Sequence, residues 1–285
     1  MLAIDKRGTV FTSQRPDGER EYRLLPSVVG WAETPFWPGK QTEETRALSP
    51  LWLEYRKEAF GEELARGGMP VVRVIPITQT LPDTSEVVPY ENLEPLVQQQ
   101  SYHAVAHCPC RLMRRSVGEG CDHSLQNCLH FGEMGRYMVE HGMAREITPG
   151  ETMTILENAH AEGLVHITDN VDAGGHLSTI CNCCGCCCIF MDTRKNLGLH
   201  TFSTSNYFAE MDQEMCIACG NCEDRCPMKA IAVDDTAVVD RKRCIGCGVC
   251  IPTCSSGGAH LVKRLEAKPP PALGDFVTAR FKMAG

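Results

Sequence analysis

The sequence lacks long apolar runs and the short motifs that bind nucleotides. No stretch of 18 apolar residues occurs in its 285 residues, and the opening MLAIDKRGTV has no long apolar core of the kind a signal peptide carries. We therefore expect a soluble, cytoplasmic protein without a membrane span. No Gly-x-Gly-x-x-Gly follows an expected strand and no P-loop lysine is present, which argues against dinucleotide and nucleoside triphosphate sites.

Positive charge is scarce relative to negative charge. The chain carries 28 Lys and Arg residues against 36 Asp and Glu residues, a formal net charge of -8 at pH 7. Such a balance argues against general nucleic-acid affinity and suits docking to a basic partner surface, although it also serves solubility. We expect no nucleic-acid partner.

Cysteine, in contrast, is abundant. The chain has 18 cysteines, several of them adjacent in sequence. Adjacent cysteines do not form disulfides of good geometry, and the pattern does not suit an extracellular framework. We interpret them as reduced metal ligands in an anaerobic cytoplasm. A chain of 285 residues also predicts one to three domains with a core beyond the metal sites.

Two cysteine runs near the C-terminus share one spacing. They are Cys216-x2-Cys219-x2-Cys222-x3-Cys226 and, 28 residues later, Cys244-x2-Cys247-x2-Cys250-x3-Cys254. Three thiolates spaced in this way wrap one iron-sulfur cube, and the fourth cysteine normally binds the other cube. The spacing predicts one [4Fe-4S] cluster on Cys216, Cys219, Cys222 and Cys254, and a second on Cys226, Cys244, Cys247 and Cys250. A pair of zinc sites is the alternative, but it does not explain the repeated rhythm.

Over residues 211–262 this duplicated motif resembles the bacterial ferredoxin with two [4Fe-4S] clusters. Pro227 follows the first run, whereas Ser255 stands at the matching place in the second. The serine weakens the turn after Cys254 but removes no ligand. The resemblance implies a ferredoxin-like domain at the C-terminal end.

Four more cysteines lie upstream, at Cys108, Cys110, Cys121 and Cys128. An alternating strand leads into the first pair, and the four could close a further cluster at a spacing that is not standard for ferredoxins. Three arginines follow that pair, Arg111, Arg114 and Arg115; they would offset the charge of a thiolate-bound cluster or form a solvated basic helix start. The neighbouring histidines are candidate ligands or hydrogen-bonding core residues: His103, His107, His123 and His130.

A cysteine octet supplies six more thiols within eight residues: Cys181, Cys183, Cys184, Cys186, Cys187 and Cys188. Successive side chains of an extended segment point to opposite faces, so Cys183 and Cys184 are not expected to serve the same cluster. The ten upstream thiols exceed by two the ligands of two [4Fe-4S] clusters. The two surplus thiols bind nothing or help to hold a larger or linked cluster. The alternative to metal binding is that these cysteines are buried free thiols that pack as small hydrophobic residues. We expect four clusters in all.

The region from RVIPI through the octet resembles, chiefly in HCPCR and ICNCCGCCC, a group of multi-cluster iron-sulfur proteins of anaerobes that accompany larger redox enzymes. The resemblance implies no defined substrate.

The remaining patterns predict an α+β fold. A β-hairpin is expected over residues 9–25. It resembles the wing of a winged-helix module, but no helix-turn-helix precedes it, so we interpret it as a docking arm or as a remnant of such a module. The proline-rich segment 26–46 is expected to lie along another surface. Ser49 and Pro50 predict the start of a helix that Gly67 and Gly68 end.

Further elements are expected along the chain. Pro76 makes the strand over residues 71–80 an edge or a connection. Helices are expected over residues 131–142 and 149–161, the second from a capping box at Thr148, and a strand over 164–168. We expect a hairpin and docking arm over 1–48, a cysteine-rich iron-sulfur domain over 49–205, the ferredoxin domain over 206–265, and a tail over 266–285 whose apolar end at 276–283 packs on the body or on a partner.

These patterns favour an electron-transfer protein or subunit that relays low-potential electrons to or from a larger redox enzyme in a hetero-oligomer. An enzyme is the second hypothesis, a reductase with chemistry at the site from Cys108 to Cys188. A redox-sensing regulator acting through the hairpin is the third. Turnover of a substrate by the protein alone would separate the first two.

Overall fold

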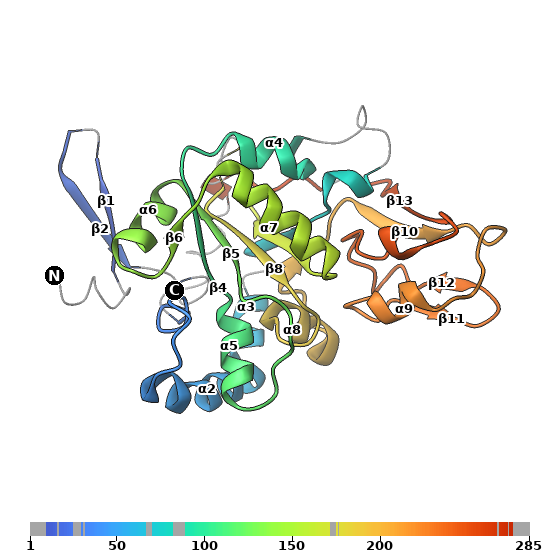
Figure 1. The fold of residues 1–285 in the computed structure, drawn as a ribbon, viewed down its shortest axis with the longest axis horizontal. Helices are drawn as coiled ribbons and strands as arrows, with labels where there is room; N and C mark the ends of the chain where they lie inside the picture. Colours follow the sequence, from blue (N-terminus) through green and yellow to red (C-terminus); the bar gives the residue numbers. More distant parts are fainter. Residues whose placement is uncertain are drawn as a thin grey trace.

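A computed structural model describes residues 10–15, 17–24, 30, 32–66, 70–81, 89–171, 175, 177–266, 268–272 and 274–275 (Figure 1). The expected glycine stop at Gly67 and Gly68 and the apolar tail at 276–283 lie outside these residues, as does Pro16 of the hairpin turn.

The described residues build one seven-stranded sheet in the order β6-β4-β5-β8-β7-β3-β9. Neighbouring strands are antiparallel except for the parallel pair β3 and β9. The strands are β3 (Val72–Ile75), β4 (His103–His107), β5 (Gln126–Phe131), β6 (Arg145–Glu146), β7 (Val165–Asp169), β8 (Thr179–Cys183) and β9 (Phe202–Ser203). Since β4 and β8 both run antiparallel to the β5 strand between them, they end at the same edge of the sheet.

Successive side chains along β5 and β8 point to opposite faces of this sheet. Leu129 and Ile180 are paired in register and join the apolar core beneath helices α4 (Leu93–Gln98) and α7 (Pro149–Ala161). Cys128 and Cys181, also paired in register, therefore lie on the opposite face. The cysteine-bearing strand ends thus share one face and one edge.

The remaining helices pack around the cysteine face. They are α2 (Glu43–Tyr55), a π-helical turn η2 (Arg56–Phe60), α3 (Gly61–Arg66), α5 (Pro109–Ser116), α6 (Gly132–Glu140) and α8 (Ile189–Leu197). Helix α5 follows β4 and α8 follows β8, and each of these helices is preceded directly by a cysteine, Cys108 and Cys188 respectively. Short 3-10 turns lie at Thr78–Thr80 and Pro89–Glu91.

The C-terminal cysteine runs form a small unit at one end of the molecule (Figure 1). It contains two antiparallel strand pairs and two short helical turns: β10 (Tyr207–Met211) with β13 (Ala259–Lys263), β11 (Ile231–Val233) with β12 (Ala237–Val239), α9 (Asn221–Arg225) and η6 (Ile251–Thr253). Its apolar residues and those of strands β3, β7 and β9 of the main sheet belong to one core cluster. The expected mixture of helix and sheet is confirmed.

The expected hairpin is present as β1 (Val10–Gln14) and β2 (Arg20–Leu24). Its base is anchored to α6: Phe11 is buried against Tyr137, whose hydroxyl donates to the Val10 carbonyl at 2.9 Å. The segment after it lies along another surface, as expected, because Phe36 and Trp37 are buried.

Two expectations about elements are wrong. Helix α2 begins at Glu43 rather than at Ser49, because Thr42 and Thr45 form a capping box; Pro50 lies inside the helix. Strand β3 is not an edge, since it pairs with both β7 and β9. Pro76 follows the strand and so removes no ladder hydrogen bond.

The helix expected after Thr148 is confirmed. The Thr148 side chain accepts the backbone N–H of Glu151 at 3.1 Å, Pro149 takes the first turn, and Gly163 beyond the end has a φ of 81°. None of the helices in the described ranges has the length and apolar character needed to cross a membrane.

Candidate metal centres

The eight cysteines of the C-terminal unit gather around two cavities of about 20 Å³ each. One cavity is lined by Cys216, Cys219, Cys222 and Cys254. The other is lined by Cys226, Cys244, Cys247 and Cys250. The fourth cysteine of each run therefore lies with the first three of the other run, which is the grouping that exchange of ligands requires.

Backbone conformation in the two runs is repeated. Ala218 and Gly220 have φ of 51° and 79°, and Gly246 and Gly248, at the matching places of the second run, have 68° and 77°. Left-handed residues at these positions turn the chain around each cavity, and glycine adopts that conformation without steric penalty. A Cβ at Gly246 would come within 2.2 Å of the Tyr207 carbonyl oxygen, so this loop has no room for a side chain.

We expect Gly246→Ala to prevent assembly of the second ferredoxin cluster, because strand β10 would have to move. Iron per chain should fall by about four, the content of one cubane. Gly220→Ala is the matched control: a Cβ there meets no atom within 4 Å, so only the left-handed backbone penalty of about 1–2 kcal/mol applies. Equal iron loss in both variants would contradict the steric explanation.

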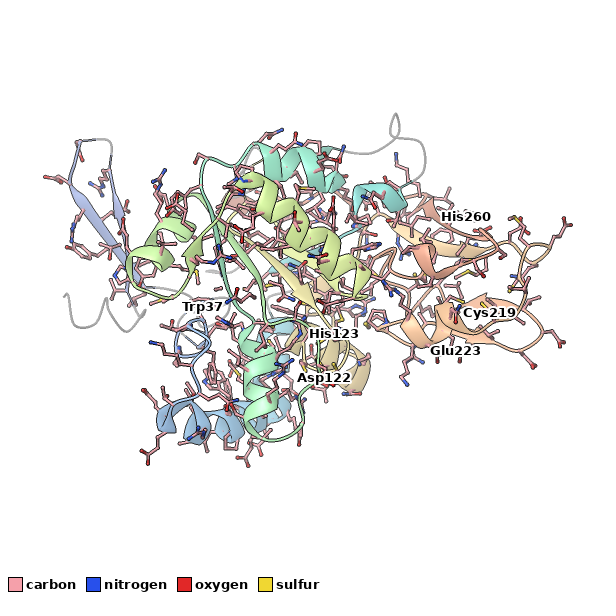
Figure 2. All side chains as sticks on the ribbon, in the orientation of Figure 1. Trp37, Asp122, His123, Cys219, Glu223 and His260 are labelled. Carbon is pink, nitrogen blue, oxygen red and sulfur yellow. The ribbon has the colours of Figure 1, made fainter. Side chains whose placement is uncertain are left out.

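The two ferredoxin sets differ in exposure. Cys219 is exposed (Figure 2). Cys244, Cys247 and Cys250, in contrast, are all buried. Backbone N–H groups point at sulfur in both sets: Ala237 donates to Cys216 Sγ at 3.3 Å and Ala230 to Cys226 Sγ at 3.2 Å. Such hydrogen bonds and solvent exposure tune the reduction potential of a thiolate-bound cluster.

Upstream, eight thiols line a larger cavity, of about 40 Å³, at the shared edge of β4 and β8. They belong to Cys108, Cys110, Cys128, Cys181, Cys183, Cys184, Cys187 and Cys188. Cys108 and Cys188 are the residues immediately before helices α5 and α8, while Cys128 and Cys181 come from paired strands. This cavity has about twice the volume of either ferredoxin cavity.

In the described part of the chain, three buried polar side chains with an unbonded nitrogen atom line this cavity or bind a residue that lines it. Trp37 lines it with its indole Nε1 buried and, within the described residues, unbonded. Arg56 Nη1 and Arg111 Nε are likewise buried without an acceptor there, although other atoms of these side chains are bonded: Arg56 to the Cys187 carbonyl at 3.1 Å and Arg111 to Asn127 Oδ1 at 2.9 Å. Unbonded buried donors are costly, and sulfide or thiolate acceptors of an anionic cluster would satisfy them.

Burial raises the pKa of Glu33, which also lines the cavity, to about 8, so its carboxyl is protonated and uncharged at neutral pH. A neutral carboxyl adds no negative charge to a site that already gathers thiolates. Sequence reasoning missed Glu33, Trp37 and Arg56, because nothing in the 26–46 segment or in the π-helical turn marks them as neighbours of cysteines far along the chain.

The four upstream histidines have hydrogen-bond partners. His130 is fully buried between Cys128 Sγ and Thr179 Oγ1, and burial lowers its pKa to about 4, so its ring is neutral. His103 contacts Thr152 Oγ1 at 3.0 Å, and His123 contacts Glu162 at 3.3 Å. His107 lies 3.2 Å from the Trp37 carbonyl. These contacts favour the hydrogen-bonding role over ligation.

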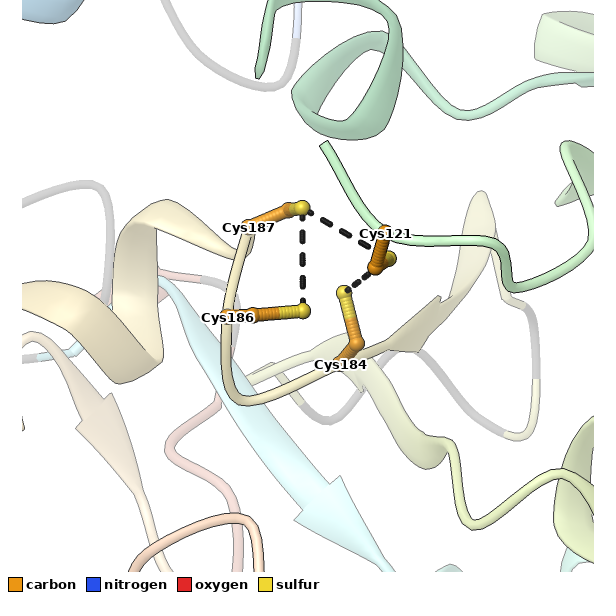
Figure 3. A group of neighbouring side chains, drawn as sticks. All are labelled: Cys121, Cys184, Cys186 and Cys187. Carbon is orange, nitrogen blue, oxygen red and sulfur yellow. Dashed lines mark hydrogen bonds between the residues drawn. The ribbon is translucent and has the colours of Figure 1, made fainter. Parts of the chain in front are cut away.

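Four upstream thiols form a tighter group: Cys121, Cys184, Cys186 and Cys187 (Figure 3). Two of them, Cys184 and Cys187, also line the larger cavity. All four sulfur atoms lie within 4.8 Å of one another. The sequence suggested that Cys121 could close a cluster with Cys108, Cys110 and Cys128. The structure instead places Cys121 with three cysteines of the octet. The loop after α5 carries Cys121 away from the first three cysteines and against the octet, because Arg115 on α5 donates to the Cys121 carbonyl at 2.8 Å and to the His123 carbonyl at 2.8 Å.

The octet also touches the ferredoxin unit. A Cβ on Gly185 would lie 2.5 Å from the carbonyl oxygen of Pro227, the residue after Cys226. Arg225 strengthens this junction by donating to the carbonyls of His160 at 2.6 Å and Ala161 at 2.9 Å, at the end of α7. The upstream and C-terminal thiol groups are thus joined by direct backbone contact.

Comparison with known families places a model described as a 4Fe-4S dicluster domain on residues 215–258. A search of curated proteins gives no match, and a search of solved structures gives none. The matched residues cover both C-terminal runs and their two cavities. The C-terminal unit is therefore a ferredoxin-type iron-sulfur domain.

Proposed function

We propose that this protein relays electrons between a redox partner and an upstream cluster, through the two clusters of its ferredoxin domain. The contact of Gly185 with Pro227 carries the proposal, because it brings the cysteine octet against the residue that follows a ferredoxin ligand. Bound [4Fe-4S] clusters would supply one-electron carriers whose potentials respond to burial and to hydrogen bonds at sulfur.

In this proposal the ferredoxin ligands are exchanged between the two runs, and the upstream cluster binds among Cys108, Cys110, Cys128, Cys181, Cys183 and Cys188. The donor set and the cavity fit a cubane, since the cavity exceeds both ferredoxin cavities in volume. Trp37, Arg56 and Arg111 would donate toward it and offset its negative charge. A total of four clusters would require a further cluster on Cys121, Cys184, Cys186 and Cys187. The sulfur atoms of this group lie closer together than those of either ferredoxin set in the described residues.

The partner would dock where the ferredoxin domain is most open. Cys219 is exposed there, and the neighbouring side chains of Met215 and Ile217 are 45% and 65% exposed. Glu214, the exposed sequence neighbour of Met215, adds negative charge beside this apolar patch, and Glu223 and Asp224 are exposed on α9 of the same domain. A larger redox enzyme with a basic docking surface in a hetero-oligomer fits this combination, and its association would weaken with salt.

The test is electron transfer within the isolated protein, purified anaerobically. After flash photoreduction, the ferredoxin clusters should be reoxidised as an upstream cluster becomes reduced, followed by visible absorption and freeze-quench EPR. Gly185→Ala should slow this step several-fold, because the added methyl forces the Pro227 backbone away and tunnelling falls steeply with distance. Gly150→Ala, in the open first turn of α7, should leave it unchanged.

Ferredoxin clusters that stay reduced beside an oxidised upstream cluster would contradict the relay. Substrate turnover by the isolated protein, insensitive to salt and to added redox partners, would instead favour a reductase acting at the upstream site.

A further inference from the structure

The tight thiol group has the spacing of ligands around one ion. Three of its sulfur–sulfur distances are 3.7 Å: Cys121 to Cys184, Cys121 to Cys187, and Cys186 to Cys187 (Figure 3). Four thiolates at about 2.3 Å from a tetrahedral zinc ion lie about 3.8 Å from one another. The observed separations therefore match a mononuclear tetrahedral site.

A cubane requires a wider arrangement, because each of its four thiolates binds a different iron at a different corner. The ferredoxin domain gives the comparison within the same chain. Among the described residues, neither of its four-cysteine sets brings its sulfurs within 4.8 Å of one another, although each surrounds a cavity. The sulfur atoms of the Cys121 group are thus spaced for a metal group smaller than the clusters expected in the ferredoxin domain.

Hydrogen bonds from neighbouring cations fix the two loops that carry this group, the loop after α5 and the octet. Arg115 fixes the Cys121 carbonyl, Arg56 the Cys187 carbonyl, and Lys195 the Gly185 carbonyl. Cys184 and Cys187 are buried against Ala159 and Leu164 at the end of α7. These cations also lie where they offset the double negative charge left by four thiolates and one divalent ion.

We propose that Cys121, Cys184, Cys186 and Cys187 bind one Zn²⁺ in a structural, four-thiolate site. All four coordination positions come from the protein, as in closed structural zinc sites, so no position is open for a substrate. The ion would clip the loop after α5 to the octet and so hold Gly185 against Pro227. The site is independent of the electron-transfer proposal, since zinc carries no electrons and would order these loops in either case.

The test uses full-length protein purified anaerobically from cells supplied with both iron and zinc. Elemental analysis should give one zinc per chain, and zinc-edge X-ray absorption should show four sulfur neighbours at about 2.3 Å. Cys121→Ser and Cys186→Ser should each lose the zinc and retain the iron. The matched control, Cys254→Ser, should lose iron and retain the zinc.

Three outcomes would overturn the proposal. They are absence of zinc from the wild-type protein, zinc bound mainly through oxygen or nitrogen, and a loss of iron rather than zinc on changing Cys121 or Cys186. The absorption measurement on wild-type protein decides the matter even if the serine variants fail to fold. The electron relay is tested by flash photoreduction and the zinc site by metal analysis and X-ray absorption, so failure of one proposal is distinguishable from failure of the other.

Discussion

In the Cys254→Ala variant we expect the cluster of Cys216, Cys219 and Cys222 to be lost while that of the second run persists. The reason is that Cys254 lines the cavity of the first run and not that of its own. Cys226→Ala should do the reverse. Each variant should lose about four iron atoms per chain and one set of EPR signals in the reduced protein.

Ser256→Ala is the control for this pair. It removes a hydroxyl 3.4 Å from Cys254 Sγ but no thiolate, so both clusters should remain and only the potential of the first should shift. If Cys254→Ala instead abolished the signals of Cys244, Cys247 and Cys250, ligand exchange between the runs would be refuted.

The second large effect is expected at the ion pair of Arg73 and Glu91. Arg73 Nη2 lies 2.9 Å from Glu91 Oε1, and both side chains are buried. The same carboxylate oxygen accepts the backbone N–H of Asn206 at 2.8 Å, directly before strand β10 of the ferredoxin domain. Removing one partner leaves an uncompensated buried charge, so Arg73→Met or Glu91→Leu should lower the free energy of unfolding by about 3–5 kcal/mol.

Anaerobic urea unfolding of the iron-loaded protein measures this effect. The double variant Arg73→Met/Glu91→Leu should be destabilised by clearly less than the sum of the single variants, because neither buried charge remains. Arg145→Gln is a matched control, since its pair with Glu151 is on the surface and exposed pairs contribute little. Additive effects at Arg73 and Glu91 would show that the pair is not coupled.

Local patterns made much of the fold and of the ferredoxin site predictable. Three ligands of each C-terminal set lie within a few residues of one another, so their spacing groups those three, whereas the fourth comes from the other run. The N-cap hydrogen bond of Thr148 and the pairing of the hairpin strands likewise join residues that are close in the sequence. The start of α2 was misplaced because Pro50 looks like a first-turn proline, whereas the hydrogen bonds of Thr42 and Thr45 begin the helix earlier.

The upstream site depends on strand order, which the sequence does not display. Cys108 and Cys181 share one edge only because β5 lies between β4 and β8. Cys121 could be assigned away from Cys110 only once the path of the loop after α5 was known. Trp37 and Glu33 line the cavity, and Arg56 binds the carbonyl of Cys187, which also lines it. All three come from elements that carry no cysteine, so no ligand spacing could have revealed them.

The unequal burial of the two ferredoxin sets has a consequence for survival in air. Oxidation of sulfur follows its accessibility, and Cys219 faces solvent whereas Cys244, Cys247 and Cys250 do not. Dioxygen should therefore degrade the outer cluster first, and bleaching should proceed in a fast and a slow phase. A protein exposed briefly to oxygen would lose the cluster at which we propose that electrons enter while the buried cluster stayed intact, so repair would need to rebuild only the outer cluster.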